Sequence, residues 1–276
     1  DFVQEHKQEI QESEDEQFWK EKPFAADSPF SREEIEYKSF DGIVLTDTFQ
    51  MTEDNSALIE DVFPQNSTRV NKLKKTPLTV IFGNPPYSVG QKSANDNAQN
   101  QHYTLLKRSV DINYARESSA TNKNSIYDSY IKAFRWSTDR FTILDSTGQK
   151  IGERDGIIGF VTNAGWLTGN AMDGMRKCFE KEFAEIYVFN LRGDQRTSGE
   201  LSRKEGGKIF GSGSRTPIAI TILVKKANFT GKAKIHYKEV DDYLKREEKL
   251  ELCKNYGSVL SSSFKSKILT PNEHGD

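Results

Sequence analysis

The stretch LTVIFGNPPY, residues 78–87, joins a short apolar run to a turn that contains two successive prolines. A continuous apolar run of four to eight residues is typical of a strand buried in a parallel sheet. We therefore predict a buried strand over residues 78–82, followed by a turn that begins at Gly83 and Asn84. Because ligands bind beyond the carboxyl ends of strands in open α/β sheets, this turn occupies the position of a binding site.

The turn carries the groups that a planar ring with an NH₂ substituent needs. Pro85 and Pro86 fix two φ angles and remove two backbone donors, while their carbonyl oxygens remain as acceptors. Asn84 adds a side-chain acceptor and Tyr87 adds a flat face for stacking. If acceptors hold both amino hydrogens, the nitrogen lone pair is left to attack an electrophile. A Pro-Pro pair alone would favour a merely structural turn, whereas the full pattern directly after a strand favours function.

Outward from this stretch, apolar runs alternate with amphipathic segments. Further strands are predicted over residues 42–46, 156–162, 184–191, 217–224 and 233–237, and helices over residues 125–140, 171–183 and 241–253. Residues 88–124 and 192–216 are polar and read as long loops, and residues 1–22 read as an acidic surface helix. Alternation of strands with helices indicates an α/β fold with a parallel or mixed sheet.

Composition narrows the functional classes. The chain has 276 residues, with 39 Lys and Arg, 41 Asp and Glu and a formal net charge of −2. This balance excludes a globally basic nucleic-acid-binding protein, so any contact with nucleic acid must come from a local patch. No window approaches the about 20 apolar residues of a membrane span, and no signal peptide opens the chain. Cys178 and Cys253 stand alone, which excludes a disulfide scaffold or a cysteine-based zinc site and favours a reduced, cytoplasmic protein.

The segment 192–216 is the best candidate for a local basic patch. Its six cations stand among glycines and serines, an arrangement suited to gripping DNA phosphates. They are Arg192, Arg196, Arg203, Lys204, Lys208 and Arg215. Asp194, Glu200 and Glu205 dilute this charge, so an ordinary solvated loop is the alternative. For Lys107, Arg108 and Arg116 the two interpretations are balanced.

The turn at residues 84–87, in this context, resembles the catalytic motif of amino-group methyltransferases that use S-adenosylmethionine, among them the DNA adenine-N6 methyltransferases. The resemblance extends to residues 44–49, 124–140, 159–167 and 191–219. Together these segments look like the methyltransferase region of bacterial restriction–modification polypeptides, in particular the single-chain, helicase-containing, ATP-dependent enzymes called type ISP. The resemblance implies a Rossmann-like, S-adenosylmethionine-dependent methyltransferase sheet.

The resemblance also implies roles for the residues of the turn. Asn84 and the Pro85 carbonyl would accept hydrogen bonds from the amino group of a flipped adenine, and Pro86 would hold the turn rigid. Tyr87 would stack on the extruded base, and Phe210 falls where the family places a second aromatic contact. Flipping is required because the amino group is inaccessible to a methyl donor inside a duplex. No metal is required by this chemistry.

For the cofactor, the resemblance implies that Asp47 accepts a hydrogen bond from its adenine, with Phe49 as an apolar wall. The family's glycine-rich cofactor loop should lie upstream of Asp47, yet Gly42 is the only glycine in residues 1–46. We therefore expect an excised piece whose methyltransferase sheet is incomplete at its N-terminus. Three parts are predicted: a connector over residues 1–39, a partial catalytic core over 40–230 and a C-terminal extension over 231–276.

The implied partner is double-stranded DNA, and in a full-length chain nuclease, helicase and specificity domains would adjoin this region. Two alternatives stay open. The same motif serves methyltransferases that act on glutamine side chains of proteins or on RNA bases. The second alternative is a catalytically inactive fragment that only binds DNA.

Overall fold

The computed structural model describes residues 42–53, 64–86, 103–210 and 215–272. The chain divides into two compact units, residues 1–43 and 44–276. Of the first unit only residues 42 and 43 are described, so the acidic helix predicted over residues 1–22 lies outside the described residues. Tyr87 and residues 88–102 also lie outside them. The boundaries proposed at residues 39 and 230 stay a prediction.

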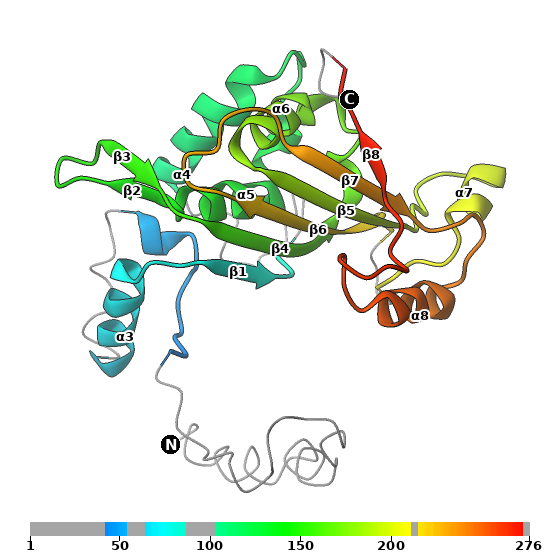
Figure 1. The fold of residues 1–276 in the computed structure, drawn as a ribbon, viewed down its shortest axis with the longest axis horizontal. Coiled ribbons are helices and arrows are strands. Elements are labelled where there is room, and N and C mark those ends of the chain that lie inside the picture. Colours follow the sequence, from blue (N-terminus) through cyan, green and yellow to red (C-terminus); the bar gives the residue numbers. More distant parts are fainter. Residues whose placement is uncertain (1–41, 54–63, 87–102, 211–214, 273–276) are drawn as a thin grey trace, which may run out of the picture. The chain divides into compact units, whose positions relative to one another are not determined.

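The second unit is built on a mixed sheet of six strands in the order β1-β4-β6-β5-β7-β8 (Figure 1). Strand β1 pairs in parallel with β4, and β5 pairs in parallel with β7, whereas β6 and β8 run antiparallel to their neighbours. The strands are β1 Val80–Gly83, β4 Gly156–Asn163, β5 Glu185–Arg192, β6 Ile218–Lys225, β7 Lys234–Glu239 and β8 Lys267–Leu269. The predicted α/β class with a mixed sheet is confirmed, and β7 and β8 show that residues beyond 230 contribute to the same sheet.

The helices follow the amphipathic segments of the sequence. They are α3 Pro64–Lys75, α4 Thr104–Val110, α5 Ser129–Asp139, α6 Asp173–Glu182, α7 Gly199–Glu205 and α8 Arg246–Tyr256. A π-helical turn, Asp111–Ala115, continues α4, and a separate hairpin pairs β2 Thr142–Leu144 with β3 Lys150–Glu153. None of the helices in the described ranges is long and apolar enough to cross a membrane.

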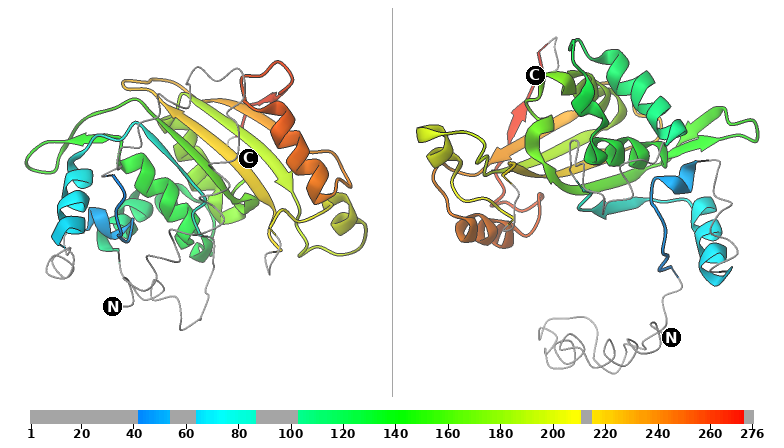
Figure 2. Two further views of the ribbon diagram at one scale, coloured as in Figure 1. Left: turned by 90° about the horizontal axis from the view of Figure 1, so that it is seen from below. Right: turned by 180° about the vertical axis from the view of Figure 1, so that it is seen from behind.

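Alternation along the strands divides the core between the two faces of the sheet. On β5, Val188 belongs to a cluster that includes residues of α4, α5 and α6, while its neighbour Phe189 packs with α8 and Phe264. Successive residues of a strand point to opposite faces, so α4, α5 and α6 pack on one face and α8 packs against part of the other (Figure 2). Phe134 of α5 and Phe179 of α6 are fully buried in the first cluster, with their ring centroids 5.4 Å apart.

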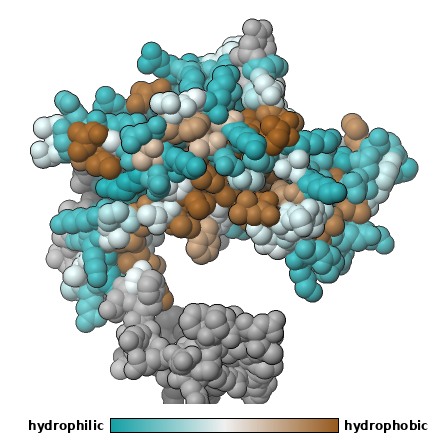
Figure 3. All heavy atoms as spheres, viewed as in Figure 1, coloured by the Kyte–Doolittle hydropathy of each residue, from teal (hydrophilic) through white to brown (hydrophobic). Residues whose placement is uncertain are grey.

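Strand β1 is parallel, as predicted, but it is not buried. Val80 is 56% exposed and Phe82 is 83% exposed, and Ile157 of the adjoining β4 is 41% exposed. Within the described ranges β1 has a single neighbour, so it forms an edge of the sheet. Apolar side chains gather over the middle of the sheet on the face drawn in Figure 3. The apolar run was therefore correct evidence for a strand and poor evidence for its burial.

Residues 42–46 are not a strand, contrary to prediction. The backbone N–H and C=O of Leu45 both bond to the side-chain amide of Asn66 in α3, each at 2.8 Å. A side chain thus satisfies the groups that a neighbouring strand would have paired. The apolar composition of residues 42–46 could not reveal that the Asn66 side chain would take the place of a neighbouring strand.

The two predicted long loops both contain helices. Residues 104–115 form α4 and its π-helical continuation, in which Leu106, Val110 and Tyr114 are buried at spacings of four. Residues 199–205 form α7. The predicted helix over 125–140 is confirmed as α5 after a 3-10 turn at Asn124–Tyr127, and the helix predicted over 241–253 begins later, at Arg246.

Candidate functional site

Four chain segments meet at one end of the sheet, where β1, β4 and β5 have their carboxyl ends. This end is called the carboxyl edge below. Residues 84–86 follow the carboxyl end of β1, residues 164–166 follow β4, and residues 193–195 follow β5. Because β6 runs antiparallel, residues 215–217 enter at the same edge before Ile218, which pairs with both Asn163 and Arg192. The structure therefore brings the Asn-Pro-Pro turn and both ends of the basic segment to one side of the molecule.

The Asn-Pro-Pro turn is accessible at this edge. Asn84 and Pro86 are exposed, and Pro85 is half-buried. Gly83 ends β1 opposite Phe160 of β4, and nothing lies within 4 Å of the position that a Cβ on Gly83 would take. The acceptors of Asn84 and Pro85 thus lie beyond the strand end, where a planar ligand can approach them. Tyr87, the predicted stacking residue, lies outside the described residues.

The turn after β4 is fixed by hydrogen bonds to its neighbour. Asn163 Oδ1 accepts the backbone N–H of Gly165 at 2.8 Å, and Ala164 donates its N–H to the carbonyl of Pro217 at the same distance. Trp166, which follows, is 3% exposed and packs edge-on against Phe179 at 5.6 Å. Trp166 is therefore part of the core rather than of the exposed strand end.

Glu205 organises the segment from Arg192 to Phe210. One carboxylate oxygen accepts the backbone N–H groups of Gly193 at 2.9 Å and Asp194 at 3.0 Å, and the other lies 3.4 Å from the Arg192 guanidinium. Gly193 has a φ of +95°, and a Cβ there would lie 3.2 Å from the carbonyl oxygen of Gly207. The close approach of the two arms of the segment therefore requires glycine.

Helix α8 holds the end of α7 and the residues that follow it, from Glu205 to Ile209. Lys249 has no exposed side chain and donates its Nζ to the carbonyls of Glu205 at 2.7 Å and Gly207 at 2.8 Å. Arg246 donates its Nε to the carbonyl of Ile209 at 2.7 Å. Phe210, the predicted second aromatic contact, is partly buried against the cluster of Phe189 and its neighbours. From Arg192 to Phe210 the chain is thus held by hydrogen bonds and includes α7, rather than being a loop throughout as predicted.

Carboxylates of the protein already pair with most of the predicted DNA-contacting cations. Arg196 forms a bidentate pair with Asp194, at 2.9 and 2.8 Å, and Arg192 bonds to Asp242. Burial alone would lower the pKa of Arg192. Its bond to Asp242 and the charge of Glu205 outweigh burial, so the pKa of Arg192 lies above its ordinary value. Arg203 lies 3.4 Å from Glu200, and Lys204 lies 3.8 Å from Asp242.

Lys208 and Arg215 differ from the other four. Among the described residues neither has an ion pair, and the side chain of Arg215 is exposed. Arg215 also connects the end of the segment to its beginning, because its carbonyl accepts the backbone N–H of Gln195 at 3.0 Å. These two cations are therefore the ones that can bind an anion without first giving up a carboxylate.

Asp47 sits in a tight turn in which its own chain uses the carboxylate. Oδ1 accepts the backbone N–H of Phe49 at 2.9 Å and of Gln50 at 3.3 Å, and Oδ2 accepts the hydroxyl of Tyr103 at 2.5 Å. An ionised carboxylate has about four lone-pair sites, so roughly one remains for a ligand. Burial and the bond to Asp47 raise the pKa of Tyr103 well above its usual range.

Phe49 is positioned next to β1 by the same turn. Its ring lies edge-on to Tyr103 at 5.3 Å, and it packs in a cluster with Leu78 and Ile81. The predicted cofactor residues therefore adjoin the strand that carries Asn84. Tyr103 was not predicted as a site residue, and its place in a polar, aliphatic-poor stretch offered no signal.

Asn190 and Tyr237 form a second feature that the sequence did not indicate. Asn190 accepts the backbone N–H of Arg192 at 2.9 Å and donates to the Tyr237 hydroxyl at 3.0 Å. This pair fixes the irregular end of β5, where the pairing with β6 shifts register. Within the described part of the chain no group of His, Cys, Asp and Glu could hold a metal ion.

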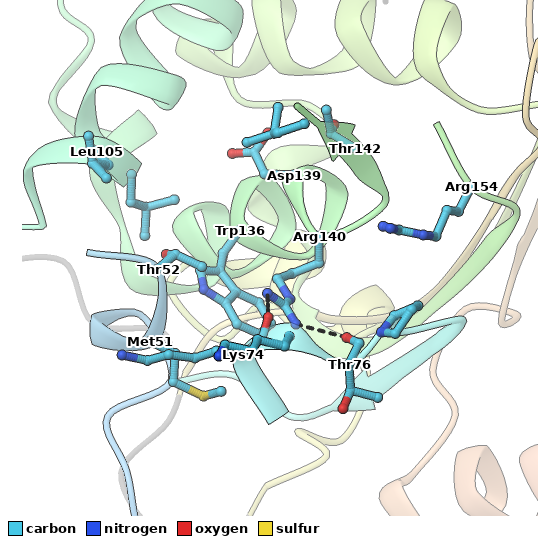
Figure 4. Close-up of a pocket in the computed structure, with 14 residues that line it drawn as sticks. Met51, Thr52, Lys74, Thr76, Leu105, Trp136, Asp139, Arg140, Thr142 and Arg154 are labelled. Atoms are coloured by element: carbon cyan, nitrogen blue, oxygen red, sulfur yellow. Dashed lines mark hydrogen bonds between the residues drawn. The ribbon is translucent and has the colours of Figure 1, made fainter. Parts of the chain in front are cut away.

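A cavity of about 520 Å³ lies away from this edge. Residues that precede β1 and β4 line it, at the amino ends of those strands (Figure 4). Cavity size and the placement of the Asn-Pro-Pro turn therefore point to two different parts of the molecule. We place the candidate site at the strand ends, because the Asn-Pro-Pro turn and both ends of the basic segment lie there.

Comparison with solved structures finds restriction-modification enzymes. The chain is similar to a nuclease-deletion mutant of the Type ISP restriction-modification enzyme LlaGI in complex with a DNA substrate mimic. The match covers 89% of this chain, with 43% sequence identity and a TM-score of 0.77. It is similar over 89% to the ATP-dependent Type ISP enzyme LlaBIII bound to DNA, with 41% identity and a TM-score of 0.78. A DrdV–DNA complex matches over 87%, with 32% identity and a TM-score of 0.74.

The chain spans 19%, 16% and 22% of those three chains, respectively. It is therefore similar, over most of its own length, to one region of much longer restriction-modification enzymes. No protein-family model matches the sequence, and no curated protein matches it either.

Proposed function

We propose that this chain is the target-base half of an S-adenosylmethionine-dependent DNA adenine-N6 methyltransferase within a restriction–modification enzyme. The observation that carries the proposal is the exposed Asn-Pro-Pro turn at the carboxyl end of β1, at the same sheet edge as the segment that leads to Phe210. The similarity to enzymes in DNA complexes supports DNA as the substrate.

In the proposed reaction, Asn84 Oδ1 and the Pro85 carbonyl accept the two hydrogens of the exocyclic amino group. The nitrogen lone pair then points out of the plane of those bonds. Pro86 keeps the turn rigid, so that both acceptors are in place before the base arrives. Positioning and polarisation of this kind are the main contribution that an enzyme makes to such a displacement. Phe210 and Tyr87 would hold the flipped ring.

S-adenosylmethionine, when bound, supplies an electrophilic methyl group, so that an N–C bond forms as the S–C bond breaks and the amino group then releases a proton. The described residues fit only one end of this cofactor. Asp47 keeps roughly one free lone-pair site for the adenine amino group, and Phe49 lies beside it. Residues 1–46 contain no Gly-x-Gly pattern for the remainder. The proposal therefore assigns to this chain the binding and orientation of the base.

The test is a methylation assay on the longest natural polypeptide that contains this sequence. Duplex DNA, RNA and protein substrates are incubated with S-adenosylmethionine and analysed by mass spectrometry. N6-methyladenine in DNA supports the proposal. Methylation of RNA bases or protein glutamine in place of DNA adenine, or DNA binding without any methylation, would reject it in favour of one of the alternatives.

A further inference from the structure

The cavity at the amino ends of β1 and β4 combines a cationic rim with an apolar wall. Its volume is about 520 Å³, within the range of roughly 300–1,000 Å³ that small-molecule sites occupy. The C-terminal end of α3, the C-terminal end of α5 and the β2–β3 hairpin enclose it. Lys74, Lys75, Arg140 and Arg154 contribute the cations, and Met51, Pro77, Leu105, Leu106 and Trp136 contribute much of the wall.

The positive charge of this cavity is not compensated from within. In the described part of the chain none of its four cations has an ion pair. Among the described residues that line it, Asp139 supplies the one carboxylate. Arg135 donates to one Asp139 oxygen from Nε at 3.0 Å and from a terminal nitrogen 2.8 Å away, and Ser109 donates to the other at 2.7 Å. Asp139 is therefore already bonded to Arg135 and Ser109, and none of the four cations pairs with it.

Arg140 is held so that one of its donors stays unused. Its terminal nitrogens donate to the carbonyls of Lys74 at 3.1 Å, Leu73 at 3.2 Å and Thr76 at 3.3 Å, but its buried Nε has no partner. Figure 4 shows the guanidinium of Arg154 directed toward Arg140. Burial lowers the pKa of Arg140, and the like charge of Arg154 lowers it further.

Trp136 supplies a second unused donor. It is 6% exposed, and its indole Nε1 is buried without a hydrogen-bond partner. In Figure 4 the indole lies between Thr52 and Arg140, among the residues that line the cavity. A buried donor without a partner destabilises the fold, so an acceptor that reached these N–H groups would remove that cost.

We propose that this cavity binds a phosphorylated small molecule of nucleotide size, with phosphate oxygens accepting from Arg140, Arg154, Lys74 and the Trp136 indole. A compact polyanion matches four cations around a concave space. A DNA duplex is the poorer fit, because protein–DNA interfaces spread over roughly 1,000–2,500 Å² of surface. The site lies at the opposite end of β1 from Asn84, so the inference does not depend on the proposed methylation.

The experiment is calorimetry of the 276-residue chain with sodium pyrophosphate, ATP, adenosine and a 12-base-pair duplex, compared with a double variant, Lys74→Gln with Arg154→Gln. Arg140 is left intact because it holds three backbone carbonyls. The control is Lys72→Gln with Lys150→Gln, which removes the same charge from α3 and from the β3 strand that precedes Arg154, at residues outside the cavity lining. Far-UV circular dichroism and thermal unfolding verify that both variants fold.

We expect pyrophosphate and ATP to bind, adenosine to bind weakly or not at all, and the cavity variant to weaken pyrophosphate binding at least tenfold. The control variant should change it less than twofold. The indole N–H resonance of Trp136, identified by its loss in Trp136→Phe, should shift when pyrophosphate is added. No binding of pyrophosphate, equal weakening in both double variants, or tighter binding of the duplex that the cavity variant abolishes would each overturn the proposal.

Discussion

At the scale of single residues, the account depends on Asn84 and Pro85 as acceptors at an exposed strand end. Replacement of Asn84 by Ala removes one acceptor from the amino group and leaves the backbone turn in place. Loss of a comparable preorganised hydrogen bond lowers kcat by about 10²–10³. We expect a loss of this size in the methyl-transfer rate of the polypeptide that carries this chain, with affinity for DNA unchanged, measured by single-turnover methylation and DNA titration.

Asn122→Ala serves as the control for this variant, because Asn122 is exposed and is not part of the Asn-Pro-Pro turn. It should behave as wild type. A methyl-transfer rate within a factor of two of wild type in Asn84→Ala would refute the role given to Asn84.

The structure also refines which cations can contact DNA. A cation that already has a carboxylate partner must give up that pair before it neutralises a phosphate, and Arg196 and Arg203 have such partners. Lys208 and Arg215 lack an ion pair among the described residues. Removal of one phosphate contact lowers the slope of log K against log salt by about 1.

We therefore expect the double variant Lys208→Gln with Arg215→Gln to lose about 2 units of that slope in DNA-binding titrations. The double variant Arg196→Gln with Arg203→Gln carries the same charge change and should lose less than half as much. An equal loss in both variants would mean that the intramolecular pairs do not select the contacts.

At the scale of elements, the apolar runs located most strands correctly, and the errors have identifiable causes. Strands β4, β5 and β6 lie within two residues of their predicted bounds, because buried strands of this length need near-continuous apolar sequence. The strand predicted over residues 42–46 was wrong because Asn66, distant in sequence, makes the hydrogen bonds of the Leu45 backbone. Helix α7 was missed because polar composition conceals a short helix whose contacts are mainly hydrogen bonds.

The site was predictable only in its motif. Residues 84–86 identify themselves by sequence, because two prolines after an apolar run are rare and chemically informative. The supporting residues were not predictable, since Glu205, Lys249 and Tyr103 act through hydrogen bonds to residues far along the chain or to backbone groups. Such contacts leave no periodic pattern.

Helix α8 provides an element-scale prediction through Lys249. Burial lowers the pKa of this amine to about 8, from an ordinary value of 10.5. Between those two pH values the unfolded chain still binds the proton that the folded chain has lost, so the free energy of unfolding rises with pH across this window. Relative to Lys249→Met, the wild type should gain roughly 3 kcal/mol of stability from pH 8 to 10.5.

Urea unfolding at several pH values measures this difference, and Lys254→Met on the exposed side of the same helix is the control. A constant difference between wild type and Lys249→Met over the window would contradict the assignment of Lys249 as a buried, desolvated amine.

Among the elements, β1 should also be the least protected of the longer sheet strands. It is an edge within the described ranges, and Val80 and Phe82 are exposed, whereas β4 and β6 each lie between two neighbours. Stability varies across a structure with burial and pairing of this kind. Hydrogen exchange of the 276-residue chain should be faster in peptides that cover 78–83 than in peptides that cover 157–162, and the reverse order would contradict the described edge.

At the scale of the whole molecule, two ends of one sheet carry different chemistry. The acceptors of the Asn-Pro-Pro turn lie at the carboxyl edge, and a cationic cavity lies at the amino edge. The near-neutral net charge of −2 therefore conceals a local concentration of positive charge. The chain as a whole is similar to one region of longer restriction-modification enzymes.

The central claim is that the Asn-Pro-Pro edge presents a flipped DNA adenine for methylation. The most direct measurement is mass spectrometry of nucleosides from duplex DNA, after incubation with S-adenosylmethionine and the longest natural polypeptide that contains this sequence. The account predicts N6-methyladenine with the wild type and a loss of at least about a hundredfold in its rate of formation with Asn84→Ala. DNA that stays unmethylated at adenine while the same preparation methylates RNA or protein would contradict it.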